Sequence, residues 1–376
     1  MYTIQDIFKI YGPTYIKRHS LSKEEWKVYN AIINCKTSNL GYHTITCEHC
    51  GNTILAFNSC RNRHCPMCQS YAREKWIDKE SEFLLSCPYF HIVTTVPYEL
   101  NEIALFNKKI FYNTLFKATS ESIMTLSEDP KWLGAKVGIT SILHTWGQTM
   151  EFHPHIHSIV TGGGIKNNKW INSKEEYLFK VQVLSSLFKN KFLSLLKKKE
   201  LIFPEKLSHL NNSKEFNKFL ESLYKKQWIT YIEPPKGSPE NVVEYIGRYS
   251  FRIAISNDRI KNIDNDMVTF EYKDYKDEGK IKLMTISAIE FIRRFLMHVL
   301  PDRFTKIKHY GILTNRNKKS LIRLCRMLIK QAIYNDFTST LKRKRKLIEF
   351  ECSECGYKKF KYTFFYRARY VIQTHR

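Results

Sequence analysis

The stretch "EFHPHIHSIVTGGG", residues 151–164, places three histidines at alternate positions of an apolar run that ends in three glycines. Alternate residues of a β-strand point to the same face, so the three imidazoles share one side while Phe152 and Ile156 serve the other. The pattern predicts a strand that offers imidazole nitrogen atoms to a metal ion. The competing interpretation is three polar positions on a half-buried strand.

The segment before this strand, "AKVGITSILHTWGQ" at residues 135–148, predicts a second strand joined to the first by the short turn "TMEF". Gln148 lies seven residues before His155, and we expect the turn to fold its strand back alongside. Its amide oxygen is a hard donor suited to Mg²⁺ or Mn²⁺, and imidazole favours Mn²⁺. We therefore expect His155, His157 and Gln148 to hold a catalytic divalent ion that has open positions for phosphate oxygens.

A cysteine cluster, "CEHCGNTILAFNSCRNRHCPMC", occupies residues 47–68. It contains two CxxC pairs separated by fourteen residues, close to zinc-ribbon spacing, and predicts one structural Zn²⁺. The four predicted ligands are Cys47, Cys50, Cys65 and Cys68. Cys60 and His64 are candidates for additional zinc ligands. A lone CxxC pair, Cys352 and Cys355, is half a zinc site, and its missing ligands stay open between Cys325, another chain and none.

The composition indicates a polyanionic partner. Lys and Arg number 61 against 36 Asp and Glu, which gives a net charge of +25, and 22 Tyr and 24 Phe supply surfaces for base stacking. A merely basic protein is the competing interpretation. The N-terminus lacks a signal-peptide pattern, and no run reaches the roughly 18 apolar residues of a membrane span. We expect a cytoplasmic, nucleoid-associated bacterial protein without a membrane partner.

Three regions are predicted along the chain. Residues 1–86 read as short helices around the zinc cluster, and residues 87–284 as an α+β unit built on an antiparallel sheet, with a helix at 239–249. Residues 285–376 read as a basic, helical C-terminal region.

The segment "SPENVVEYIGRYSFRIAIS", residues 238–256, begins with the signature of a helix N-terminus. Tyr245 and Tyr249 stand four residues apart, so a helix places them on one face. Such a pair is often core packing. Arg248 and Arg252 beside the tyrosines favour an anionic neighbour.

The motif "HPHIH" followed by "GGG", with "YIGRYSFRIAIS" about ninety residues later, resembles the two-tyrosine HUH rolling-circle transposases of the insertion sequence 91 family. HUH denotes His, a hydrophobic residue and His, met here by His155, Ile156 and His157. The blocks "SCRNRHCPMCQ", "PYFHIVTTVP" and "MTISAIEFIRRFLMHVLP" extend the resemblance over nearly the whole chain. It implies an HUH-type antiparallel sheet sandwiched by helices, with an N-terminal zinc-ribbon domain.

The resemblance implies roles for particular residues. The two motif histidines ligate the metal ion, and Tyr245 and Tyr249 are the YxxxY nucleophiles. Gln148 matches by spacing the third ligand of related replication initiators, where the position is often acidic. His153 then orients a ligand or faces phosphate.

The implied reaction is the nicking and joining of single-stranded DNA at transposon ends and targets. One tyrosine, with Tyr249 as our choice, attacks the phosphate and leaves a 5′-phosphotyrosine and a free 3′-OH. The second tyrosine then cleaves another strand. Whether two copies associate as a homodimer stays open. The arginines expected to contact DNA are Arg61, Arg63, Arg248, Arg252, Arg293 and Arg294.

Three other functions fit parts of the sequence. An HUH replication initiator or relaxase-type nickase shares the chemistry, although no helicase P-loop motif is present. A zinc-ribbon DNA-binding protein without catalysis would use only the cysteines. A phosphodiesterase that activates water with its metal ion would form no covalent adduct.

Overall fold

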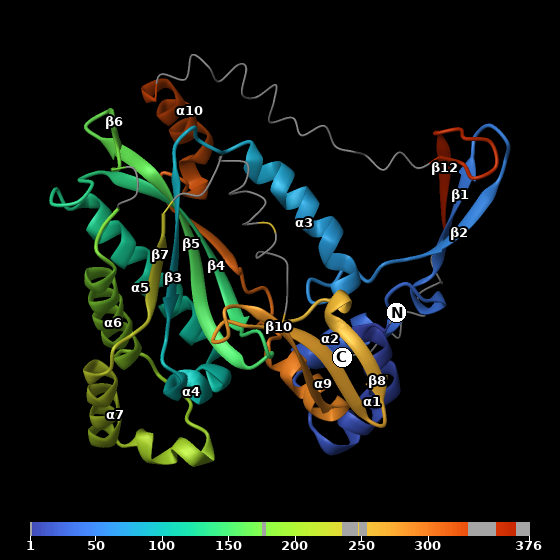
Figure 1. Cartoon of the computed structure of the whole chain (residues 1–376), viewed down its shortest axis with the longest axis horizontal. Coiled ribbons are helices and arrows are strands. Elements are labelled where there is room, and N and C mark those ends of the chain that lie inside the picture. Colours follow the sequence, from blue (N-terminus) through green and yellow to red (C-terminus); the bar gives the residue numbers. More distant parts are fainter. Residues whose placement is uncertain (1, 175–177, 235–246, 248–253, 330–350, 366–376) are drawn as a thin grey trace, which may run out of the picture.

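The computed structural model describes residues 2–174, 178–234, 247, 254–329 and 351–365, and within these ranges not the side chains of residues 70–72, 364 and 365. The predicted tyrosine helix at 239–249 lies outside the described residues except for Gly247. The described chain combines helices with antiparallel sheets, which confirms the predicted α+β class (Figure 1).

The largest sheet has the strand order β11-β4-β5-β3-β7, with β6 paired to β5, and all its pairs are antiparallel. Its strands are β3 (Tyr89–Thr95), β4 (Lys136–Trp146), β5 (Phe152–Lys166), β6 (Lys169–Asn172), β7 (Thr230–Glu233) and β11 (Ile307–Gly311). The predicted β4–β5 hairpin is confirmed and lies at the centre. The β5–β6 hairpin turns at Asn167 and Asn168, whose positive φ angles of 47° and 54° suit a tight two-residue turn.

One face of this sheet is covered by helices (Figure 1). They are α5 (Lys108–Glu128) and α6 (Val181–Lys197), with η2 (Tyr98–Leu100), α4 (Asn101–Phe106), η3 (Glu205–Asn211) and α7 (Ser213–Lys225) beside them. Ile156 of β5 is fully buried here with Phe111 and Phe188 of the helices. This is the apolar face that the alternation in β5 predicted.

The opposite face packs against α3 (Pro66–Ser81) and α10 (Lys318–Leu328), which follows the short helix η5 (Asn315–Asn317). Ile77 of α3 and Ile322 of α10 share a buried cluster with Ile142 and Ile159 of the sheet. Because Ile142 pairs directly with His157, the histidines of β5 lie on this second face.

The N-terminal helices share their core with a later part of the chain. The elements are α1 (Ile4–Arg18), α2 (Lys23–Asn34), η4 (Asn257–Arg259), β8 (Ile260–Asp264), β9 (Met267–Asp274), β10 (Lys280–Ser287) and α9 (Ala288–Met297). Phe8 contacts Phe295 edge to face at 5.3 Å between ring centroids. This core thus contains residues from all three predicted regions, 1–86, 87–284 and 285–376.

Besides the three-stranded sheet of β8, β9 and β10, another three-stranded sheet stands apart from these layers (Figure 1). It contains β1 (Tyr42–Cys47), which follows η1 (Ser38–Leu40), β2 (Thr53–Phe57) and β12 (Phe360–Phe365), in the order β12-β1-β2. The prediction of a helical region over 285–376 is wrong at residues 360–365 and at β11, because both segments pair with the open edges of earlier strands.

Across the described residues, every helix is too short or too polar to cross a membrane.

The glycine run after the histidines allows close approach of neighbouring chains. A Cβ at Gly164 would lie 2.4 Å from the backbone oxygen of Lys136 on β4, beside the register shift between Val137 and Ile139. A side chain at this position would push the two central strands apart.

We expect Gly164→Ala to lower the free energy of unfolding by about 1–3 kcal/mol, because backbone must move to admit the methyl group. Gly147→Ala is the matched control: the atoms nearest its Cβ belong to the exposed Glu151 carboxylate, which can move away at the cost of its bonds to Thr149, so its effect should stay below about 1 kcal/mol. Denaturant unfolding of both variants measures the difference. Equal losses would contradict this explanation of the run.

His298 ties the end of α9 to the β4–β5 turn. Its Nε2–H donates to the Met150 carbonyl at 3.1 Å, and its Nδ1 accepts from the Thr145 hydroxyl at 3.1 Å. Burial lowers the pKa of His298 to about 3. Its folded pKa lies below the unfolded value near 6.5, so this stabilisation is complete above about pH 6.5 and is lost as pH falls towards 3.

Between pH 6.5 and pH 5, His298 should therefore remove about 2 kcal/mol from the free energy of unfolding. The stability difference between the wild type and His298→Gln, measured by denaturant unfolding, should shrink by this amount over that interval. His209→Gln, at an exposed position, is the control and should leave the profile unchanged. A pH-independent difference for His298→Gln would contradict the burial of a neutral imidazole.

Candidate functional site

Three imidazoles converge on the face of the sheet that packs against α3 and α10. His144 comes from β4, and His155 and His157 come from β5. Their ring nitrogen atoms lie within 4.8 Å of one another, and the Nε2 atoms of His155 and His157 are 3.0 Å apart. His144 faces His155 directly across the strand pair and is only 3% exposed.

The structure corrects the prediction for Gln148. Strand β4 ends at Trp146, so Gln148 lies in the turn and not on the strand. Its side chain reaches β9 and the residue after it. The side-chain oxygen lies 3.5 Å from the main-chain nitrogen of Lys273, and the amide nitrogen lies 3.4 Å from the Tyr275 hydroxyl. His144 takes the position predicted for it, because the hairpin register places residue 144 opposite His155.

Hydrogen bonding determines which nitrogen of His155 carries the proton. Its Nδ1 lies 2.7 Å from the main-chain oxygen of His153. A carbonyl oxygen can only accept, so Nδ1 carries the hydrogen and the Nε2 lone pair points away from the strand. His153 thus orients His155 through its backbone.

A relay of two side chains determines the protonation of His157 in the same way. His157 Nδ1 lies 2.8 Å from His91 Nε2, and His91 Nδ1 lies 3.3 Å from a carboxylate oxygen of Glu233. Because the carboxylate accepts, His91 donates through Nδ1 and accepts at Nε2 from His157 Nδ1–H. The Nε2 lone pair of His157 then faces that of His155.

This geometry fits a bound cation. Two nitrogen atoms bound at about 2.1 Å and at right angles lie about 3.0 Å apart, the distance between His155 Nε2 and His157 Nε2. Burial lowers the pKa of His155 to about 3 and that of His157 well below its ordinary value. Both rings are therefore neutral at pH 7, which is the form that ligates metals.

The sequence interpretation missed His144, His91 and Glu233. His144 and Trp146 alternate in β4 as the histidines do in β5, and counting back from the turn pairs His144 with His155. His91 lies on β3 and Glu233 on β7, so only the strand order brings them to His157.

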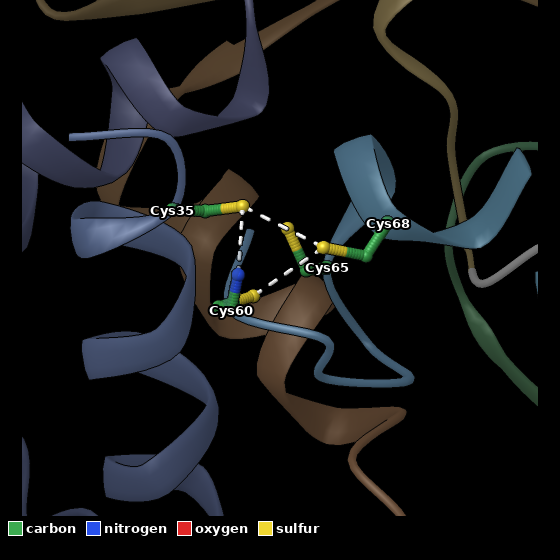
Figure 2. Close-up of side chains that lie close together, drawn as sticks. All are labelled: Cys35, Cys60, Cys65 and Cys68. Atoms are coloured by element: carbon green, nitrogen blue, oxygen red, sulfur yellow. Dashed lines mark hydrogen bonds between the residues drawn. The ribbon is translucent and has the colours of Figure 1, made fainter. Parts of the chain in front are cut away.

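The cysteines form two clusters rather than one. Figure 2 shows the first, in which Cys35 from the end of α2 and Cys60 meet Cys65 and Cys68 at the start of α3. Cys68 Sγ lies 3.6 Å from both Cys35 Sγ and Cys60 Sγ. Four sulfur atoms bound to Zn²⁺ at about 2.3 Å are about 3.8 Å apart in a tetrahedron, so this set fits the ion.

The predicted set of Cys47, Cys50, Cys65 and Cys68 is therefore wrong, since the β1–β2 hairpin carries its first pair away from its second. Cys47 and Cys50 lie instead with Cys352 and Cys355. Spacing in the sequence indicated the CxxC pairs but not which pairs meet.

Of the two additional candidates, Cys60 lies in the first cluster and His64 does not. The Cys60 N–H donates to Cys35 Sγ at 3.5 Å. The pKa of Cys35 is lowered to about 7, and the hydrogen bond with the Cys60 side chain is the largest cause. His64 Nε2 accepts from the Leu300 N–H at 3.1 Å, and burial lowers its pKa to about 3. The His64 ring thus fastens the cluster to the chain after α9.

Three of the arginines predicted to contact DNA make internal contacts. Arg63 donates to the carbonyl oxygens of Phe304 and Pro301. Arg293 and Arg294 both bind Glu290, through Nε at 2.6 Å and 2.7 Å, and together lower its pKa to about 2. A role in DNA binding stays a prediction for them.

Of the other three arginines, the structure describes Arg61. Arg61 is exposed and lines a cavity of 470 Å³ with Lys27 and Arg303. Arg248 and Arg252 lie outside the described residues, as do Tyr245 and Tyr249, and their predicted roles stay predictions.

Comparison with known proteins finds two family matches along the chain. Residues 7–96 match the family described as "Transposase zinc-binding domain", and residues 138–321 match the family described as "Putative transposase". The putative transposase y4qJ of Sinorhizobium fredii is 43% identical over 337 residues, which cover 88% of this chain and 85% of that protein. No solved structure matches the chain.

The transposase for insertion sequence element IS801 of Pseudomonas savastanoi is 26% identical over 303 residues, covering 78% of this chain and 71% of that protein. The fold and its cysteine clusters thus define the class, a transposase with a zinc-binding domain. Within that class, the chain belongs to the insertion sequence 91 family.

We expect His91→Phe to weaken Mn²⁺ binding by about 10–100-fold, because His157 loses the acceptor that orients it. Calorimetric titration with Mn²⁺ measures the affinity, since this hard ion avoids the thiolate clusters. His309→Phe is the matched control. His309 lies on β11 of the same sheet, 3.7 Å from Glu80. It hydrogen-bonds Thr140 and none of the three converging histidines. Unchanged affinity in His91→Phe, or equal losses in both variants, would contradict the relay.

Proposed function

We propose that this transposase nicks and rejoins single-stranded DNA through a covalent phosphotyrosine formed beside the three histidines. The observation that carries the proposal is the convergence of His144, His155 and His157 on one face of the sheet, with the Nε2 lone pairs of His155 and His157 oriented by the surrounding hydrogen bonds. Single-stranded transposon ends and targets are the proposed substrates.

The position of Gly247 supports the proposed nucleophiles. Gly247 is buried, and a Cβ there would lie 2.2 Å from Ile77 Cδ1 of α3. Ile77 belongs to the cluster that covers the histidine face of the sheet. Gly247 stands midway between Tyr245 and Tyr249 in the sequence, so both tyrosines are two residues from a point anchored on the histidine side.

The proposed reaction exchanges one phosphodiester for another. The phenolate oxygen of one tyrosine, Tyr249 in our proposal, bonds to phosphorus while the bond from phosphorus to the 3′ oxygen breaks. The leaving oxygen takes up a proton and becomes a free 3′-OH, and the 5′ phosphate stays on the tyrosine. A 3′-OH that attacks this link rejoins a strand and releases the tyrosine.

The histidine set also bears on the cofactor. A divalent ion held there would polarise the scissile phosphate as a Lewis acid. Three imidazoles form a softer set than the two imidazoles and one amide expected from the sequence, which favours Mn²⁺ over Mg²⁺. The ligands keep their lone pairs available at neutral pH because burial holds His155 and His157 in the neutral form.

The experiment incubates labelled single-stranded oligonucleotides from the ends of the element with the protein and Mn²⁺, followed by denaturing gels. We expect label to stay on the wild-type protein and to disappear in the Tyr245→Phe/Tyr249→Phe double variant. Single variants identify which hydroxyl attacks first. Cleavage without a protein-linked product would favour a metal-activated water, and binding without cleavage would favour a DNA-binding protein without catalysis.

A matched pair of substitutions tests the ligand set in the same assay. His144→Ala should reduce adduct formation by at least about 100-fold, while Gln148→Ala should leave most of it. Both should retain single-strand binding, because phosphate contacts dominate affinity. The opposite order of the two variants would restore the amide ligand predicted from the sequence.

A further inference from the structure

A second group of four thiols brings the β1–β2 hairpin together with residues 352–355. Cys47 Sγ lies 3.7 Å from Cys355 Sγ, and Cys50 Sγ lies 3.5 Å from Cys352 Sγ. All four sulfur atoms are within 4.8 Å of one another. A disulfide requires about 2.05 Å, whereas the edge of a zinc–thiolate tetrahedron is about 3.8 Å.

The two CxxC segments form the same turn. Cys47 accepts at its carbonyl from the Gly51 N–H at 3.1 Å, and its own N–H donates to Asn52 O at 2.8 Å. Cys352 repeats both bonds with residues at the same spacings, Gly356 and Tyr357, each at 2.9 Å. Two copies of one knuckle therefore face each other, from segments about 300 residues apart.

The glycine in each knuckle is required by the backbone. Gly51 has a φ of 76° and Gly356 a φ of 70°, a region that other residues rarely adopt. A Cβ at either position would meet nothing within 4 Å, so packing does not explain the glycine. The positive φ turns the chain back after the second cysteine and leaves both sulfur atoms on one side.

Strand pairing holds the knuckles in register. Cys47 at the end of β1 pairs with Phe360 at the start of β12, and the Glu48 N–H donates to Lys359 O at 3.1 Å. The sheet has little core of its own: Leu55 is 53% exposed and Tyr362 is 53% exposed. A sheet of this size needs a metal ion or a covalent link to be stable.

We propose that Cys47, Cys50, Cys352 and Cys355 bind a second structural Zn²⁺, which clamps the C-terminal segment 351–365 onto the N-terminal β1–β2 hairpin. Four thiolates at these separations select Zn²⁺ over hard cations. The matched zinc-binding domain, residues 7–96, contains only half of these ligands. The other half arrives from the far end of the chain.

Zinc counting by mass spectrometry on the full chain tests the shared site. Cys50→Ser and Cys352→Ser should each lose one Zn²⁺ per chain relative to the wild type, and the double variant should lose the same single ion. Cys35→Ser/Cys352→Ser should lose two, since Cys35 belongs to the first cluster. Cys325→Ala, at a buried cysteine outside both clusters, should lose none. Additive losses in Cys50→Ser/Cys352→Ser, or no loss in Cys352→Ser, would overturn the proposal.

A second measurement stays informative if serine variants fold poorly. A protease site inserted after residue 340 allows the folded wild-type chain to be cut, and size-exclusion chromatography then follows the C-terminal fragment. The fragment should co-elute with the remainder until a zinc chelator releases it, and in the Cys325→Ala control it should behave the same way. Release without chelator, or retention despite complete removal of zinc, would overturn the clamp.

Discussion

The convergence of the three histidines depends on the register of one pair of strands. When β4 pairs with β5 so that His144 meets His155, three imidazoles share a face and the apolar residues Leu143 and Ile156 share the other. A shift by one residue would send the histidines into the core beneath α5. The burial of Ile156 against the helices therefore fixes the same register that brings the three histidines together.

The core shared by the N-terminal helices and α9 holds the end of this hairpin. Met150 is buried in the core formed by α1, α2 and α9, and its carbonyl accepts from His298. The preceding carbonyl, of Thr149, accepts from Arg294 at 2.9 Å. Both donors lie on or just after α9, within the core that also contains Cys35 and Cys65. The turn between β4 and β5 therefore shares its core with the first cysteine cluster.

The sequence was sufficient where a signal was local. Alternation in residues 152–157 predicted strand β5 and its two faces. The prediction placed Gln148 on strand β4, but the strand ends two residues before it, at Trp146. Alternation does not mark this boundary. Partners such as Glu233 depend on strand order, which no local pattern contains.

The cysteine clusters show the same difference between local patterns and long-range pairing. A CxxC spacing reports one knuckle, but joining two knuckles is a long-range choice. Closing a loop of 302 residues between Cys50 and Cys352 costs on the order of 5 kcal/mol in chain entropy before any constant term. Zinc binding to a structural thiolate site supplies about 10–16 kcal/mol, which exceeds that cost. Distance along the chain is therefore a weak constraint on which cysteines meet, whereas the β1–β12 pairing decides it because it delivers both knuckles with the same turn and facing sulfur atoms.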